Sequence, residues 1–158
     1  MLVDRASIRA ILLSRENEVL LLRIRHPDTK EGFWITPGGG LEPGEGITDG
    51  LKRELKEELG LEEYAVGPLV WRRQHTFNWA GKRICQREQY YIVRADRFEP
   101  RMSDPEEAKV LDGFRWWSLD ELFNSTECLT PLSLADIVAR FLAHGPPQGP
   151  LDLEILED

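Results

Sequence analysis

The chain has few cysteines, few histidines and no long hydrophobic run. Its 158 residues include two cysteines and three histidines, and Cys85 and Cys128 stand neither in a C-x-x-C pair nor at ligand spacing from a histidine. This scarcity argues against a disulfide scaffold and against a zinc site. The early apolar run at 10–13 is too short for export or for a membrane span, and Asp4 stands where a signal peptide needs positive charge. We therefore expect a cytoplasmic protein without a membrane segment.

Positive charge is also scarce. Lys and Arg number 20 against 28 Asp and Glu, which gives a formal net charge of -8. Proteins that grip extended nucleic acids need basic surface to neutralise phosphates, so this balance argues against such a partner while leaving room for a small phosphate ester. With 41% hydrophobic residues, the chain can bury one core. We expect a single domain at 1–144 and a Pro-rich, acidic tail at 145–158.

Apolar patterns separated by turn-forming residues predict an α/β fold with a mixed β-sheet covered on both sides. Strands are expected at 7–13, 18–23, 33–36, 66–77, 83–95 and 113–117, and the first two should form an antiparallel hairpin. Helices are expected at 48–59, 118–123 and 132–142. The three glycines at 38–40 are expected to exclude a regular element, and the acidic stretch 99–108 is expected to be a loop.

The predicted helix at 48–59 carries a stripe of glutamates. Glu54, Glu57 and Glu58 fall within about 100° of one another on a helical wheel. The stripe borders the leucines expected to be buried, so the acids should lie beside a cleft. Carboxylates this close repel one another, and a hard divalent cation relieves that repulsion. Since no His or Cys is near, Mg²⁺ is expected rather than zinc. A solvated acidic face is the alternative for an isolated E-x-x-E-E.

The residues around this stripe match a longer pattern. Gly39 is followed after five residues by Glu45, and after seven more by Arg53-Glu54-Leu55-Lys56-Glu57-Glu58-Leu59-Gly60-Leu61. The segment resembles the Nudix box of the Nudix hydrolases at every fixed position. Seven specified positions coincide by chance on the order of 10⁻⁸ times per starting position. The resemblance implies a Nudix-type α/β/α sandwich with a mixed sheet, in which the box forms a loop and a helix.

The resemblance also implies a function. Nudix hydrolases cleave a pyrophosphate bond in a nucleoside diphosphate linked to another moiety, by attack of water at phosphorus with the help of a divalent metal. The implied cofactor is Mg²⁺, with Mn²⁺ as a substitute, and the implied substrate is a small nucleotide. A homodimer is common in the family.

The resemblance to the Nudix box also implies a role for each of its residues. Glu54, Glu57 and Glu58 resemble the metal-binding carboxylates, and Gly39 resembles the residue whose carbonyl group joins them. Glu54 or Glu57 is the expected general base. The resemblance further implies two supports, Glu45 and Arg53, which would pair to hold the loop against the helix.

Outside the box the markers are weaker. Several family enzymes recruit an acid from a loop ahead of the last strand, so Glu107, then Glu106, is a candidate catalytic residue; a solvated surface loop is the alternative. Arg23 and Arg25 end a predicted strand and are candidates for binding substrate phosphates, with simple exposure as the alternative. Phe77 offers a ring on which a base could stack, unless it packs in the core.

The sequence leaves two alternative functions to consider and does not identify the substrate. A Nudix-fold domain can bind a nucleotide as a sensor or interaction module without hydrolysing it, although the complete set of box glutamates argues against this. Isomerisation of a small diphosphate by a catalytic cysteine is disfavoured, because neither Cys85 nor Cys128 lies in the strand before the box. The region 74–79 lacks the proline and the tyrosine that mark some substrate classes in the family, so the nucleobase and the leaving group are not assigned.

Overall fold

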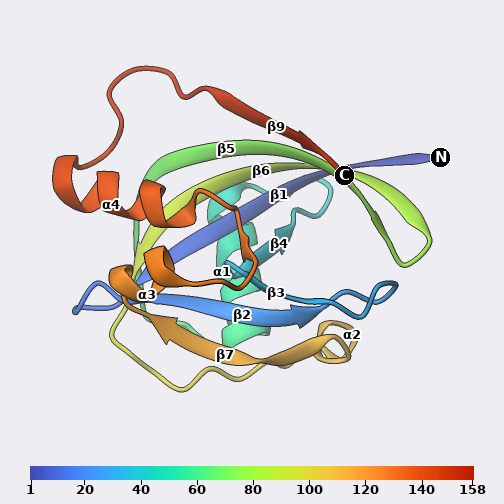
Figure 1. The fold of residues 1–158 in the computed structure, drawn as a ribbon, viewed down its shortest axis with the longest axis horizontal. Helices are drawn as coiled ribbons and strands as arrows, with labels where there is room; N and C mark the ends of the chain where they lie inside the picture. The colour runs from blue at the N-terminus through green and yellow to red at the C-terminus, as the bar shows by residue number, and fades with distance from the viewer.

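Four strands precede the first helix in the computed structural model, which describes residues 1–158, and the other helices stand between the later strands (Figure 1). The strands are β1 (Leu2–Leu13), β2 (Val19–Arg25), β3 (Gly32–Ile35), β4 (Gly38–Gly40), β5 (Ala65–Trp79), β6 (Lys82–Arg94), β7 (Leu111–Trp117), β8 (Leu129–Thr130) and β9 (Leu153–Glu157). The helices are α1 (Ile47–Leu59), α2 (Pro105–Ala108), α3 (Leu119–Asn124) and α4 (Leu134–His144). The predicted α/β fold with a mixed sheet is confirmed.

Strand β1 connects the two parts of the sheet. It pairs in parallel with β6 along its whole length, and its other edge accepts β4 in antiparallel orientation. Strands β5 and β6 form an antiparallel hairpin, and β9 adds to β5 in parallel. On the other side of β1, β2 pairs with β3 and β7, and β8 extends β3.

The predicted hairpin of the first two strands is only partly present. Strands β1 and β2 are antiparallel, but they pair at a single position, Leu13 opposite Val19. They diverge beyond the turn because β6 and β4 already occupy the edges of β1. The divergence separates Arg9 of β1 from Ile24 of β2, and both residues line the large cavity described below.

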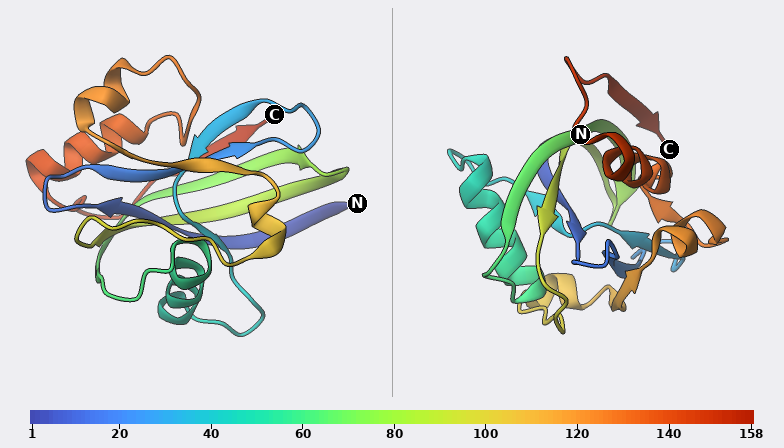
Figure 2. Two further views of the ribbon diagram at one scale, coloured as in Figure 1. Left: turned by 90° about the horizontal axis from the view of Figure 1, so that it is seen from below. Right: turned by 90° about the vertical axis from the view of Figure 1, so that its left-hand side faces the viewer.

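Two apolar clusters lie on opposite sides of the strands. Helix α1 buries Leu51 and Leu55 against residues of β1 and β2 that include Ile8. Helix α4 buries Leu134 and Val138 in a second cluster, with other residues of β1 and β2. The right-hand view of Figure 2 shows α1 and α4 on either side of the strands. Helices therefore cover both faces, as the apolar patterns predict.

The glycine run forms a strand, contrary to the expectation for 38–40. Gly38 lies opposite Arg9 in the pairing of β4 with β1. Its φ is +137°, and a Cβ atom there would lie 2.1 Å from the carbonyl oxygen of Ile8. Because glycine has no Cβ atom, the backbone of the box loop can lie directly against β1.

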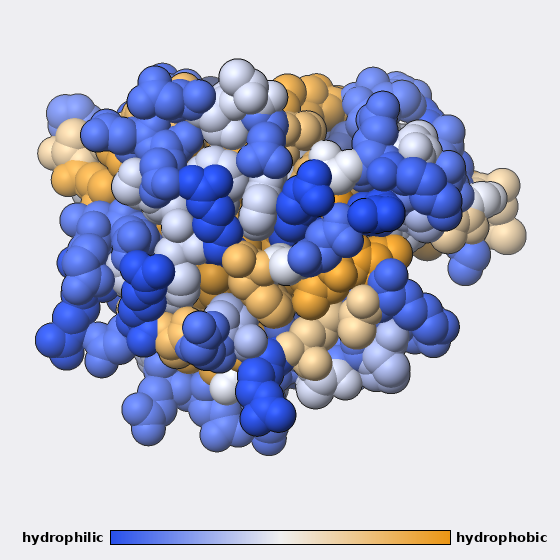
Figure 3. All heavy atoms as spheres, turned by 60° about the horizontal axis from the view of Figure 1, so that its bottom comes forward, coloured by the Kyte–Doolittle hydropathy of each residue, from blue (hydrophilic) through white to orange (hydrophobic).

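The acidic stretch and the tail each contain a short helix or strand. The stretch 99–108, expected to be a loop, contains α2, which the Asp104 carboxylate caps by accepting hydrogen bonds from the backbone N–H groups of Glu106 and Glu107. Residues 153–157 form β9 at the edge of β5. No helix is long and apolar enough to cross a membrane. On the face shown in Figure 3, hydrophilic side chains surround an apolar band.

Candidate active site

Helix α1 carries two of the three box glutamates into the protein. Its leucine stripe is buried, and Glu54 and Glu58, each 5% exposed, lie beside that stripe. At about 100° per residue, Glu58 lies about 40° from Glu54, whereas Glu57 lies about 60° from it on the other side. The side chain of Glu57 is accordingly 42% exposed and approaches Arg53 at 3.4 Å.

A third carboxylate meets this pair from a different element. Oxygen atoms of Glu54, Glu58 and Glu107 all lie within 4.8 Å of one another. Glu107 belongs to α2, and the segment before α2 is attached to the end of α1: the Arg101 N–H donates to the Leu59 carbonyl at 3.0 Å, and the Ser103 N–H donates to the Glu57 carbonyl at 2.7 Å. The structure thus brings together Glu54, Glu58 and Glu107, while Glu57 lies outside this acidic cluster.

The acidic cluster is electrostatically unfavourable without a cation. Burial and the charge of Glu107 raise the pKa of Glu54, and the same two causes raise the pKa of Glu58 well above its ordinary value. All three donors are carboxylates, the ligands that hard divalent cations prefer. Gly39 fits this arrangement, because a Cβ atom at its position would lie 2.7 Å from Oε1 of Glu54. The residues present therefore fit a divalent metal ion.

Arg53 connects the box loop to the helix. Its Nε and Nη2 donate to the two carboxylate oxygens of Glu45, each at 2.8 Å. Nη2 also donates to the carbonyl group of Gly40 at 2.9 Å, and Nη1 donates to Glu54 at 2.9 Å. Hydrogen bonds from Arg53 and from the Glu42 N–H lower the pKa of Glu45 to about 2. The two expected supports are thus in contact with each other, and Arg53 also contacts Glu54 of the acidic cluster.

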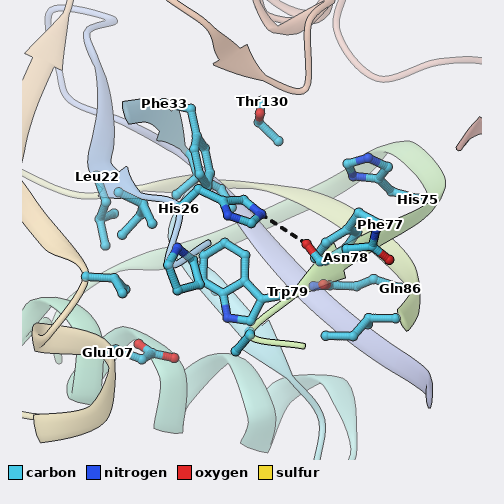
Figure 4. Close-up of a pocket in the computed structure, with 18 of the residues that line it drawn as sticks. Leu22, His26, Phe33, His75, Phe77, Asn78, Trp79, Gln86, Glu107 and Thr130 are labelled. Atoms are coloured by element: carbon cyan, nitrogen blue, oxygen red, sulfur yellow. Dashed lines mark hydrogen bonds between the residues drawn. The ribbon is translucent and has the colours of Figure 1, made fainter. Parts of the chain in front are cut away.

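A cavity of about 1130 Å³ lies beside the acidic cluster, and Glu58 and Glu107 belong to its lining. Aromatic side chains cover part of its wall, as the close-up in Figure 4 shows: His26, Phe33, Phe77 and Trp79. His26 reaches across from the end of β2, and its Nε2 lies 3.0 Å from the carbonyl oxygen of Asn78. The rings of His26 and Trp79 meet edge to face, with centroids 4.9 Å apart. The cavity therefore offers flat apolar surface next to the carboxylates.

Of the three substrate-binding residues predicted outside the box, one lines the cavity and two do not. Phe77 lines the cavity. Arg23 and Arg25 do not line it, because strand alternation directs their neighbours Leu22 and Ile24 toward it. Both arginines instead contact Asp112 of β7, Arg23 at 3.1 Å and Arg25 at 3.3 Å.

Glu106 also differs from Glu107. Its carboxylate contacts Lys109 at 3.0 Å and is 79% exposed. Of the two acids considered for this segment, Glu107 alone joins the acidic cluster.

Sequence reasoning missed a buried group of ionic residues in the same cavity. Arg9, Arg73 and Glu88 all line it; Arg73 and Glu88 come from the hairpin of β5 and β6, whereas Arg9 comes from β1, far away in the sequence. The sequence contains one signal for this group. Every second residue of the segment that forms β5 is basic or aromatic: Arg73, His75, Phe77 and Trp79. Residues at this spacing lie on one face of a strand.

Comparison with known proteins connects this arrangement to a family. A family model described as "NUDIX domain" matches residues 3–141. An RNA pyrophosphohydrolase of Yersinia enterocolitica is 31% identical over 129 residues, covering 72% of this chain and 69% of that protein. A human 8-oxo-dGDP phosphatase is 44% identical over 54 residues, a match that spans 34% of this chain and only 16% of the human protein.

Solved structures share the fold. A MutT protein from Methanosarcina mazei aligns with a TM-score of 0.62 at 24% identity, covering 92% of this chain and 97% of that one. An Ap4A hydrolase from C. elegans aligns with a TM-score of 0.63 at 19% identity, covering 88% and 98%. At these identities the likeness concerns the architecture of the sheet and helices.

Proposed function

Because this chain belongs to the Nudix hydrolase family, whose members hydrolyse pyrophosphate bonds, we propose that the cluster of Glu54, Glu58 and Glu107 is its catalytic centre. The substrate in this proposal is a nucleoside diphosphate linked to another moiety. The supporting observation is the convergence of three carboxylates, all within 4.8 Å, at the border of a cavity of about 1130 Å³. The cavity provides room for the organic part of a nucleotide while the acidic cluster marks the position of its diphosphate.

We infer that the acidic cluster holds Mg²⁺, with Mn²⁺ as a substitute, and that the Gly39 carbonyl group contributes to the same site. When bound, such a cation supplies positive charge that neutralises the phosphate oxygens and makes water more acidic. The protein's part is to fix its ligands in advance. Glu58 accepts a hydrogen bond from the Gly38 N–H at 2.8 Å, and Arg53 donates to Glu54 at 2.9 Å.

Proton transfer from the attacking water needs a free carboxylate. We propose Glu54 and Glu57 as the two candidate acceptors: Glu54 belongs to the acidic cluster, and Glu57 is more exposed on the adjoining face of α1. Glu107 approaches from α2, and its carboxylate would help Glu54 and Glu58 to hold the cation beside the diphosphate. Glu45 and Arg53 act indirectly, by holding the loop that carries Gly39.

Phe77 and the other aromatic side chains of the cavity wall are proposed to receive the base. A nucleobase is flat and apolar on its faces, so it matches a wall that contains Phe33, Phe77 and Trp79. Arg23 and Arg25 have no part in this proposal, because their ion pairs with Asp112 and, for Arg23, with Glu127 hold them outside the cavity.

The test is product release across a panel of phosphoanhydrides. The panel contains nucleoside triphosphates, nucleotide sugars and CoA, together with Ap4A, 8-oxo-dGDP and a short RNA with a 5′-triphosphate. Each compound is incubated with Mg²⁺, Mn²⁺ or EDTA, and phosphate, pyrophosphate and nucleotide products are quantified. We expect metal-dependent release from one class. If every compound stayed intact while one of them raised the melting temperature, the chain would be a nucleotide-binding module instead.

A further inference from the structure

Two buried arginines share a single carboxylate on the floor of the cavity. Arg9 donates from Nε to Glu88 at 2.9 Å, and Arg73 donates from Nε to the other oxygen of Glu88 at 2.7 Å. The side chains of Arg73 and Glu88 are 3% and 2% exposed. Two guanidinium groups thus share Glu88, and the acidic cluster balances part of the charge of Arg9, because the negative charges of Glu88 and Glu58 raise the Arg9 pKa against the effect of burial.

The two arginines differ in how many of their donors are used. Arg9 also donates from Nη1 to the carbonyl groups of Thr36 and Gly38, at 3.3 and 3.2 Å. Arg73 makes no hydrogen bond through either terminal nitrogen, and its guanidinium stands 5.9 Å from the centre of the Tyr90 ring. Arg73 lines the cavity, so its unused donors belong to the cavity floor.

This arrangement raises the free energy of the folded protein when no ligand is bound. A buried charge needs a partner, because transfer from water to the interior removes its solvation. Guanidinium presents two parallel N–H groups that match the oxygens of a phosphate or a carboxylate. Arg73 carries a charge and leaves the N–H groups of both terminal nitrogens unused, which favours an anion over a neutral group.

We propose that Arg73 forms an anion-binding subsite, and that the substrate carries a second anionic group, a phosphate ester or a carboxylate, in addition to its diphosphate. This inference rests on the proposed function, since it concerns another group of the same substrate. Arg9 supports the subsite by sharing Glu88 and also holds the Gly38 carbonyl, whose residue contacts Glu58 through its N–H. The second anion would therefore bind close to the acidic cluster, because these hydrogen bonds connect Arg73 to Glu58 through Glu88, Arg9 and Gly38.

Matched substrate pairs test the proposal. CoA and dephospho-CoA, NADPH and NADH, and UDP-glucuronate and UDP-glucose each differ by one anionic group. In the pair that the enzyme hydrolyses, we expect kcat/KM to favour the more anionic member about tenfold or more, the range of a charged hydrogen bond. Arg73→Gln should reduce that preference to about one, and Arg73→Lys, which keeps the charge, should preserve part of it.

A second measurement detects an anion that comes from solution. Inorganic phosphate should raise the melting temperature of the wild type and leave that of Arg73→Gln unchanged. Arg72→Gln is the matched control, because Arg72 is the next residue on β5, does not line the cavity and donates to the Leu151 carbonyl. This control should behave like the wild type in both measurements.

The outcomes separate clearly. A charge preference that depends on Arg73 supports a substrate anion, and phosphate stabilisation without such a preference supports a subsite for free phosphate. Absence of both effects overturns the subsite. A change in preference among nucleobases, with the paired preference unaltered, also overturns it, because Arg73 would then bind a neutral carbonyl. Absence of all hydrolysis in the wild type would instead refute the proposed function, and the phosphate measurement would still decide the subsite.

Discussion

The guanidinium of Arg53 donates hydrogen bonds to both carboxylate oxygens of Glu45, with N–O distances of 2.8 Å. The same group donates to the Gly40 carbonyl and to Glu54, each at 2.9 Å. Arg53 therefore joins the box loop, the helix α1 and the acidic cluster in one hydrogen-bonded unit. Positioning of Glu54 and Gly39 should depend on this unit.

Arg53→Lys should lower kcat about 10- to 100-fold, the usual cost of losing a group that orients metal ligands. Lysine keeps the charge but cannot reproduce the planar fork that holds Glu45, Gly40 and Glu54 together. Steady-state kinetics measure the effect. Lys56→Ala serves as the control, because Lys56 lies on the same helix but pairs with Glu62 at the surface. Equal activity of the Arg53→Lys variant and this control would contradict the supporting role.

The Glu45 carboxylate should contribute to stability only above acidic pH. Its pKa is lowered to about 2 in the folded protein, against about 4.3 in an unfolded chain. A lowered carboxyl pKa stabilises the folded state fully above the unfolded value, and this contribution disappears as pH falls through about 2. The melting temperatures of the wild type and Glu45→Gln should therefore differ most near pH 6 and converge toward pH 2. A difference that stays constant over this range would show that Glu45 is not held as the structure has it.

Glu107 and Glu106 form a natural pair of variants. Glu107→Gln should lower kcat by about 100-fold or more and change KM less, because its carboxylate would help to hold the cation that neutralises charge developing in the transition state. Glu106→Gln should stay close to the wild type, since Glu106 pairs with Lys109 in solvent. Comparable losses in both variants would indicate a structural effect on α2 rather than a role for one carboxylate.

Divalent metal should stabilise the protein through the acidic cluster. Mg²⁺ at a hundredfold excess over its dissociation constant adds about 2.7 kcal/mol to the free energy of unfolding if it binds only the folded state. The triple variant Glu54→Gln, Glu58→Gln, Glu107→Gln should lose most of this gain in a thermal melt. A control with the exposed Glu62 and Glu63 changed to Gln should keep it. Undiminished stabilisation of the triple variant would place the ion elsewhere.

Gly38→Ala should destabilise the fold strongly. The positive φ of Gly38 alone costs an alanine about 1–3 kcal/mol, and its Cβ would meet the carbonyl oxygen of Ile8 at 2.1 Å. Gly46→Ala is the control, because Gly46 has a φ of -80° and open space around it. Denaturant unfolding should show a large loss for the first variant and little change for the second. Similar stabilities would mean that β4 does not lie against β1.

The features that the sequence predicts best are those that depend on the periodicity of a single helix. The spacing of Glu54 and Glu58 beside a leucine stripe follows from helical periodicity, which acts over a few residues. The same spacing also groups Glu57 with them, because three- and four-residue steps look alike on a wheel. Which of the neighbours points inward depends on how α1 packs, and the sequence of the helix does not contain that information.

Long-range strand pairing limited the prediction of the rest. Arg9 joins Arg73 and Glu88 because β1 pairs in parallel with β6, a contact that no local pattern reveals, whereas β5 and β6 form a hairpin. A local rule predicts no strand for the glycines of β4, since it cannot foresee that β1 needs a partner without side chains. The position of Arg23 and Arg25 at the end of a strand predicts contact with substrate, but the alternation of β2 directs Leu22 and Ile24 to the cavity instead.

The most direct test of the central claim is the rate of pyrophosphate-bond hydrolysis by the wild type and by Glu58→Gln across a series of Mg²⁺ concentrations. The substrate is the best compound of the panel, and melting curves verify that both proteins are folded. We expect wild-type activity to saturate with Mg²⁺ and to vanish in EDTA, while Glu58→Gln stays at least about 100-fold slower at every concentration. A folded Glu58→Gln variant that retains most of the wild-type rate would contradict the assignment of this acidic cluster as the catalytic centre.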